Sequence, residues 1–251
     1  MKTVILFRHA HPEIGGFILD HDRPLASDGI SDAEKKAVLS VLDKEYLGMG
    51  TEVELFEKEL SELFNRTTIC VVNGTAALHL ALQACNIKCG DEVLVPSLTY
   101  IASFQAISAT GATPIPCDIS ETDYLLDIRD AEDRISSKTK AIMPVHYSGG
   151  TDNLDAVYTF ARKYNLRVIE DAAHAFGTIH NNMKIGSFGD ITCFSFDGIK
   201  NITSGEGGCI ISDDEIVLQK VRDARLLGVE KDTDKRYKGT RSWNFNTSVQ
   251  G

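Results

Sequence analysis

The feature that most constrains the fold is a regular alternation of short apolar runs with longer amphipathic segments. The apolar runs have the length of strands and occupy residues 68–72, 92–96, 113–117, 141–145, 167–170, 191–195 and 208–212. Segments with apolar residues at helical spacing separate several of these runs, at residues 75–85, 101–110 and 152–164. Strands that alternate with helices predict an α/β fold, in which a mainly parallel sheet carries helices on both faces.

The residues before this region have a different pattern. Residues 4–7 are apolar and predict a short strand, whereas residues 11–29 are interrupted by proline and glycine and predict a loop. Ser31 and Glu34 fit a capping box, so we expect a helix to begin at Ser31. A second helix is expected over residues 52–64, where apolar side chains recur on one face.

Composition argues against several classes of function. The 26 basic and 36 acidic residues give a formal net charge of −10, which argues against a nucleic-acid partner because a phosphate backbone requires a basic patch. No apolar run approaches the roughly 20 residues that span a bilayer, and the run at residues 4–7 is too short for a secretory signal. The 6 cysteines lack the spacing of a zinc site. We therefore expect no metal, reduced cysteines in the core and a cytoplasmic protein.

An acidic pair follows one of the predicted strands. In the stretch RVIEDAAHAFG, an apolar run leads directly into Glu170 and Asp171, and His174 comes three residues later. An acid at a strand end is typical of a helix N-cap, but it also suits an acid held against a heterocyclic nitrogen. Ligands of parallel sheets bind beyond the carboxyl ends of the strands, so the second interpretation assigns Asp171 to a site.

A lysine follows the next predicted strand. In CFSFDGIKNITSGEGG, Lys200 lies between an apolar run and a glycine-rich turn. Most lysines are solvated surface charges. A lysine that is partly withdrawn from water has a lower pKa and becomes a nucleophile for a carbonyl carbon.

Two further strand ends carry weaker signals. In VVNGTAALHLAL a strand leads through Gly74 and Thr75 into a helix, whose N-terminus can bind a phosphate. In PSLTY, Tyr100 follows a strand and suits either ordinary core packing or the face of an aromatic cofactor. The order along the chain is therefore phosphate turn, aromatic residue, acid and lysine, each at a strand end.

The blocks NGTAALHLAL, EDAAHAFG and SFDGIKNITSGEGG together resemble the DegT/DnrJ-type sugar aminotransferases. The resemblance covers about residues 30–251. It implies the large domain of a type I PLP-dependent transferase, with pyridoxal 5′-phosphate (PLP) as the cofactor. Some family members carry histidine in place of the lysine and act as dehydratases, so Lys200 indicates transamination.

The resemblance implies a role for each matching residue. Lys200 forms the Schiff base and moves the proton, and Asp171 pairs with the pyridine nitrogen; these two are the catalytic residues. His174 lies near the ring hydroxyl, and Tyr100 stacks on the ring. The complete set implied for cofactor binding is Gly74, Thr75, Tyr100, Asp171, His174, Ser195, Lys200 and Asn244.

The phosphate site in this resemblance is shared between two subunits. Gly74, Thr75 and Ser195 hold the phosphate of their own subunit, whereas Asn244 reaches the phosphate of the neighbouring one. This implies a homodimer with shared active sites. Asn246 departs from the family pattern, which has arginine there, so that contact is not carried over.

The two ends of the sequence also differ from the family. Members continue into a smaller C-terminal domain, whereas this sequence stops at Gly251. We therefore expect the small domain to be absent, PLP to bind weakly and turnover to be poor. Residues 1–29 are expected to form an N-terminal arm, in which Arg8 and His9 resemble the arginine–histidine pair of the histidine phosphatases.

The sequence thus predicts a PLP-dependent aminotransferase. It would transfer an amino group from an amino acid, glutamate by expectation, to a nucleotide-linked keto-sugar. Two alternatives stay open: a catalytically impaired PLP-binding or regulatory protein, and a phosphohydrolase that uses His9.

Overall fold

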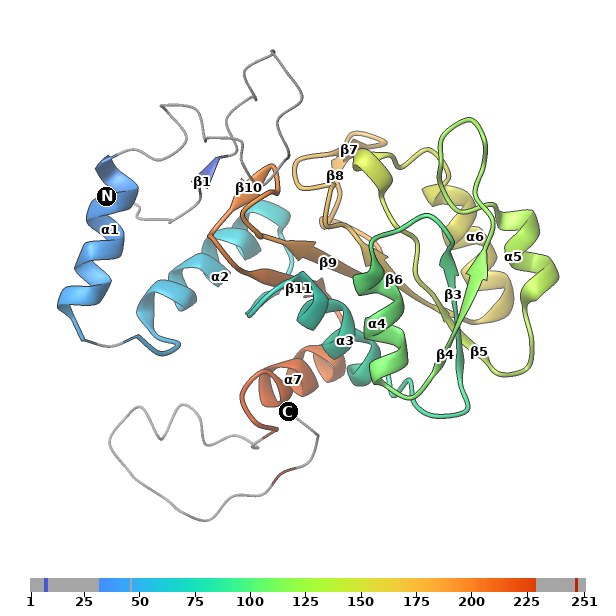
Figure 1. The fold of residues 1–251 in the computed structure, drawn as a ribbon, viewed down its shortest axis with the longest axis horizontal. Coiled ribbons are helices and arrows are strands. Elements are labelled where there is room, and N and C mark those ends of the chain that lie inside the picture. The colour runs from blue at the N-terminus through green and yellow to red at the C-terminus, as the bar shows by residue number, and fades with distance from the viewer. Residues whose placement is uncertain (1–6, 9–31, 46, 229–246, 248–251) are drawn as a thin grey trace.

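The computed structural model describes residues 7–8, 32–45, 47–228 and 247. Its centre is a seven-stranded sheet with the order β2-β11-β9-β6-β5-β3-β4 (Figure 1). The strands are β2 (Thr68–Val71), β3 (Glu92–Pro96), β4 (Thr113–Cys117), β5 (Thr139–Ile142), β6 (Arg167–Asp171), β9 (Ile191–Ser195) and β11 (Gly208–Ser212). The pairs β3–β4, β3–β5, β5–β6 and β6–β9 are parallel, which confirms the predicted α/β fold with a mainly parallel sheet.

One strand runs against the others. β11 is antiparallel to both β9 and β2. Parallel neighbours need a crossover connection, usually a helix. Residues 196–207 between β9 and β11 contain only the short strand β10 (Ile202–Thr203), so the chain turns back on itself.

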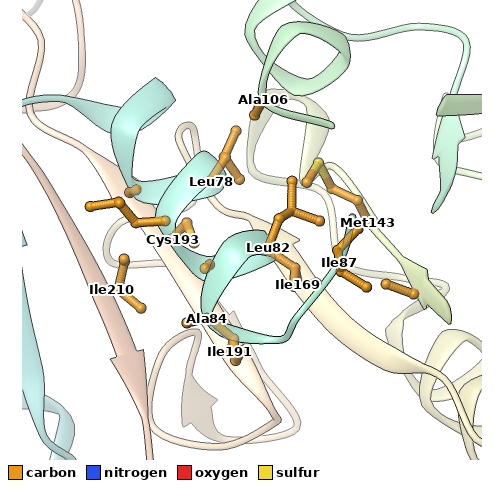
Figure 2. Close-up of a cluster of buried hydrophobic side chains, with 14 of the residues drawn as sticks. Leu78, Leu82, Ala84, Ile87, Ala106, Met143, Ile169, Ile191, Cys193 and Ile210 are labelled. Atoms are coloured by element: carbon orange, nitrogen blue, oxygen red, sulfur yellow. The ribbon is translucent and has the colours of Figure 1, made fainter. Parts of the chain in front are cut away.

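Helices cover both faces of the sheet. They are α2 (Thr51–Phe64), α3 (Gly74–Ala84), α4 (Ile101–Ala109), α5 (Ile128–Arg134), α6 (Leu154–Tyr164) and α7 (Glu215–Ala224), preceded by α1 (Asp32–Asp43). α3, α4 and α7 share one apolar cluster with the sheet, part of which is shown in Figure 2. α2, α5 and α6 contribute to the two clusters on the other face.

The strands supply both faces because their side chains alternate. In β9, Ile191 and Cys193 pack into the first cluster, whereas Phe194 packs into the second. In β3, Val93 and Val95 pack into the first cluster. A strand buried on both sides is therefore apolar on both faces, which is why these runs were recognisable in the sequence.

Several short elements did not emerge from the sequence pattern. They are α5, α7, the hairpin β7 (Ile179–His180) and β8 (Met183–Lys184), the strand β10, and a 3-10 turn at Tyr147–Gly149. The expected strand at 141–145 is displaced, since β5 ends at Ile142. β7, β8, β10 and the 3-10 turn have only two or three residues and are too short to show a period, whereas α5 with 7 residues and α7 with 10 are longer.

The N-terminal predictions are only partly covered. β1 (Phe7–Arg8) pairs with β10 at the end of the expected strand 4–7. α1 begins at Asp32, directly after the predicted start at Ser31. Ser31, the loop at 11–29 and His9 lie outside the described residues.

The cysteines depart in one respect from the expectation. All six are free, and Cys117, Cys193 and Cys209 are buried. Cys89, however, is exposed, because it lies in the turn between α3 and β3 rather than in an element that packs on the sheet. Within the described ranges, no helix is long and apolar enough to cross a membrane.

Candidate active site

The phosphate turn predicted at Gly74 lies against the end of β9. Asn73 caps α3, and its side-chain oxygen accepts a hydrogen bond of 2.8 Å from the Ala76 N–H. A Cβ atom at Gly74 would lie 2.7 Å from the Cβ of Ser195. The structure therefore brings together two residues that the sequence separates by more than a hundred positions, at the N-terminus of a helix that can receive an anion.

A second glycine makes this close approach possible. A Cβ atom at Gly208, the first residue of β11, would lie 2.6 Å from the backbone carbonyl of Asn73. Only glycine at both positions lets the α3 turn sit against β9 and β11. Thr75 follows in the first turn of α3 and is half-buried.

Asp171 is the last residue of β6 and is buried at 6% exposure. Its Oδ2 accepts a hydrogen bond of 2.7 Å from the Ser103 hydroxyl, and its Oδ1 accepts one of 3.2 Å from the Ala173 N–H. No helix begins after this strand, so the helix N-cap interpretation is wrong. The carboxylate therefore lies at the carboxyl end of β6, on the same side of the sheet as the carboxyl ends of its parallel neighbours.

The acidic pair divides between two environments. Glu170 is 1% exposed, and its Oε2 lies 2.8 Å from His146 Nε2. Its Oε1 accepts a hydrogen bond of 2.6 Å from the Tyr158 hydroxyl. Neighbouring residues of a strand point to opposite faces, so Glu170 is used in the interior while Asp171 is at the candidate site.

Lys200 lies half-buried in the loop between β9 and β11. Its backbone N–H donates to the Asp197 carbonyl at 3.0 Å. The adjacent Asn201 side chain donates 2.7 Å to the carbonyl of Phe176, which ties this loop to the segment after Asp171. Across the part of the chain that the structure describes, the Lys200 ammonium makes no recorded hydrogen bond or ion pair.

His174 reports the proximity of these groups. The surrounding protein lowers the pKa of His174 by withdrawing solvent from the ring. The positive charge of Lys200 lowers this pKa further, and the negative charge of Asp171 opposes it. The imidazole is therefore neutral near pH 7, within electrostatic range of both the predicted catalytic residues.

Tyr100 is not a core residue. It precedes α4 directly and is 72% exposed, so the core-packing interpretation is wrong and its side chain is free to meet a ligand. Asn244, predicted to reach a neighbouring subunit, lies outside the described residues.

The sequence interpretation missed Ser103 and Thr99. Ser103 is fully buried, and its hydroxyl lies 2.8 Å from that of Thr99. A polar residue on the apolar side of α4, in the stretch IASFQAI, is the signal that could have pointed to Ser103.

This arrangement combines three chemical capacities. It holds an anion-binding helix N-terminus, a buried carboxylate that can accept a hydrogen bond from a cationic ring, and a primary amine without a protein partner among the described residues. A model of the DegT/DnrJ/EryC1/StrS aminotransferase family matches residues 28–249. The chain belongs to this family. A helix N-terminus for an anion, a buried carboxylate and a primary amine are the features that the family resemblance led us to expect together.

Curated and solved relatives agree with the family. The chain is 42% identical over 199 residues to the GDP-perosamine synthase of Escherichia coli O157:H7, covering 78% of this chain and 55% of that protein. DesV of S. venezuelae, solved with a ketimine intermediate, has a TM-score of 0.76 at 34% identity, covering 86% of this chain and 56% of that one. NtdA of Bacillus subtilis, solved with its cofactor PMP (pyridoxamine phosphate) bound, has a TM-score of 0.75 at 30% identity. The match covers 86% of this chain and 48% of that one.

These coverages show a difference in length. The chain spans about half the length of the relatives that it matches, with 55%, 56% and 48% for the three above. The relatives that are solved structures confirm the type I aminotransferase fold for the part that this chain represents.

Proposed function

We propose that this chain forms the cofactor-binding part of a PLP-dependent aminotransferase acting on a nucleotide-linked keto-sugar. The observation that carries the proposal is that Asp171 ends β6 beside β9, which ends at Ser195 against Gly74, and that the charges of Asp171 and Lys200 act on the same imidazole, His174. The residues fit the cofactor: the carboxylate is buried, the amine has no protein partner among the described residues, and Gly74 and Ser195 meet at the N-terminus of α3, where an anion is favoured. Named relatives, including a GDP-perosamine synthase, support the substrate class.

Each residue has a distinct task in this proposal. PLP supplies the electron sink on which transamination depends. With PLP bound, Asp171 would keep the ring nitrogen protonated, and Lys200 would hold the cofactor covalently and move the proton. Gly74, Thr75 and Ser195 bind the phosphate. The other predicted contacts within the same subunit are His174 at the ring hydroxyl and Tyr100 on the ring face.

The partners follow from the same proposal. An amino acid, glutamate by expectation, donates the amine, and the nucleotide-linked sugar receives it. The protein acts as a cytoplasmic homodimer in which Asn244 of one subunit reaches the phosphate held by the other. Mixing Lys200→Ala with Asn244→Ala chains tests this, because a shared site restores one intact centre per dimer and separate sites restore none.

The assignment of Lys200 is tested by trapping the cofactor. The chain is loaded with PLP, reduced with borohydride and digested, and the modified peptide is identified by mass spectrometry. The label is expected on Lys200 and is expected to disappear in Lys200→Ala. Lys184→Ala, which removes an exposed lysine from β8, should keep the label. A label that persists in Lys200→Ala would sink the assignment.

The same loaded protein separates the alternative functions. A transaminase changes its absorption spectrum when glutamate converts the bound cofactor, whereas a protein that only binds PLP keeps the spectrum unchanged. The phosphohydrolase alternative, which depends on His9, predicts phosphatase activity that His9→Ala removes.

A further inference from the structure

Within the described residues, hydrogen bonds rather than an ion pair hold the buried Asp171 carboxylate. The carboxylate is 6% exposed, and none of the ion pairs recorded for the described residues includes it. A buried charge without a counter-ion must be satisfied by hydrogen bonds. The recorded donors to the carboxylate are the Ser103 hydroxyl on Oδ2 and the Ala173 N–H on Oδ1.

The hydrogen bonds that link Thr99, Ser103 and Asp171 have a defined direction. An ionised carboxylate can only accept, so the hydroxyl hydrogen of Ser103 points to Asp171 over the 2.7 Å contact. Ser103 then has only lone pairs to offer Thr99, 2.8 Å away, so Thr99 is the donor of that contact. The order is therefore Thr99 to Ser103 to Asp171.

The backbones of Ser103 and Asp171 are both held by hydrogen bonds. Ser103 lies in the first turn of α4, where its N–H donates 3.2 Å to the Tyr100 carbonyl. The Asp171 N–H donates 2.9 Å to the Pro144 carbonyl, and the Asp171 carbonyl accepts 3.0 Å from the His146 N–H. With a donor on each oxygen and both backbones fixed, the plane of the carboxylate has little freedom to rotate.

We propose that Ser103, held in turn by Thr99, is a positioning residue that fixes the Asp171 carboxylate in the orientation needed to meet the cofactor ring nitrogen. This rests on the role proposed for Asp171. Ser103 does not touch the ring in this proposal and acts only through the carboxylate. Its hydrogen bond to Asp171 explains why a small polar side chain occupies a fully buried position on the apolar face of α4.

The first test uses the protein without cofactor. Aspartate carboxyl carbons are labelled with ¹³C, and the Asp171 resonance is assigned by its loss in Asp171→Asn. Ser103→Ala and Thr99→Val are expected to move this resonance, because each removes one hydroxyl from the chain. Thr99→Ser keeps the hydroxyl and should leave it close to the parent position. An Asp171 carboxyl chemical shift that is the same in Ser103→Ala as in the parent protein would overturn the proposal.

The second test uses the PLP-loaded protein and the half-reaction with glutamate. Loss of a hydrogen bond to a charged group predicts a rate lower by about tenfold to a hundredfold in Ser103→Ala, with the cofactor still attached to Lys200. In an Asp171→Asn background the same change should have almost no further effect, because the residue acts through the carboxylate. A similar loss in both backgrounds would mean a general structural role and refute the proposal.

The two tests also separate this inference from the proposed function. If PLP does not attach to Lys200, the proposed function fails, and the carboxyl resonance still decides whether Thr99 and Ser103 hold Asp171. If PLP attaches and the resonance does not move, the function stands and the positioning role is wrong.

Discussion

Single residues at the candidate site are defined by what their side chains contact rather than by their motif alone. Glu170 and Asp171 are adjacent acids, yet Glu170 pairs with His146 in the interior, whereas Asp171 accepts a hydrogen bond from Ser103 at the carboxyl end of β6. Lys200 is distinguished in turn by its charge acting on the same imidazole, His174, as the charge of Asp171. Local environment thus divides one acidic motif into a structural residue and a candidate catalytic residue.

The pKa of His174 provides a test of this local environment. Because the charge of Lys200 lowers that pKa, Lys200→Met should raise it toward its usual value. Asp171→Asn should lower it further, since the carboxylate favours the imidazolium. NMR titration of the cofactor-free protein measures both changes. Lys184→Met is the control and should have no effect; equal shifts in Lys184→Met and Lys200→Met would contradict the site geometry.

Gly74 tests the contact between the phosphate turn and β9. Gly74→Ala places a Cβ atom 2.7 Å from Ser195 Cβ, so the turn must move and PLP affinity should fall. Overpacking of this kind costs about 1–3 kcal/mol of folding stability. Gly198→Ala is the matched control in the lysine loop, because the nearest atom to its Cβ is 3.8 Å away. Cofactor titration and urea unfolding compare the two; equal tolerance of both changes would count against the contact.

At the scale of elements, side-chain pairs hold the strand ends in place. His146 follows β5, and its Nδ1 lies 3.2 Å from the Gly150 carbonyl while its Nε2 contacts Glu170 on β6. Arg66 performs a comparable task elsewhere, with its guanidinium bonded to four backbone carbonyls between Gly186 and Asp190. Buried polar groups of this kind fix loops that apolar packing alone leaves free.

The His146–Glu170 pair predicts a large stability effect. Glu170→Gln replaces the buried carboxylate that His146 and Tyr158 both contact, and losing hydrogen bonds to a charged group costs about 1.5–3 kcal/mol. Urea unfolding measures the change. Glu132→Gln is the control, because Glu132 contacts Lys163 at the exposed surface and such pairs contribute little. A Glu170→Gln chain as stable as Glu132→Gln would show that the pair is not a structural link.

At the scale of the whole molecule, burial divides the six cysteines. Burial raises the pKa of Cys85 to about 12 and that of Cys117 to about 11. It also raises the pKa of Cys70, Cys193 and Cys209 above the ordinary value. Cys89 differs, since it is exposed.

A thiol reagent at pH 8 should therefore modify Cys89 rapidly and the other five cysteines only as the protein unfolds, because a buried thiol forms little thiolate. Absorbance of the released reagent group follows the two phases. Cys89→Ser should remove the fast phase, and denaturant should expose every thiol at once. Rapid reaction of two or more thiols in the native protein would show that the apolar clusters open more readily than their packing implies.

The sequence by itself determined the class of fold and the location of the candidate residues along the chain. Strands buried on both faces are mainly apolar, so the runs around Val93, Ile169 and Cys193 were visible without a structure. Ligands bind beyond strand ends in such sheets, which directed attention to Asp171 and Lys200. Both inferences depend on local properties of a few consecutive residues.

Only the tertiary structure decided which residues meet. The contact of Ser103 with Asp171 joins positions 68 residues apart, and the reversal of β11 follows from how a loop packs rather than from its composition. The strand pattern also could not say what covers each of the two adjacent acids, because alternation defines two faces without naming their neighbours; only the strand-end position and the family resemblance pointed to Asp171. Long-range packing places His146 and Tyr158 around Glu170 and leaves Asp171 at the carboxyl end of β6.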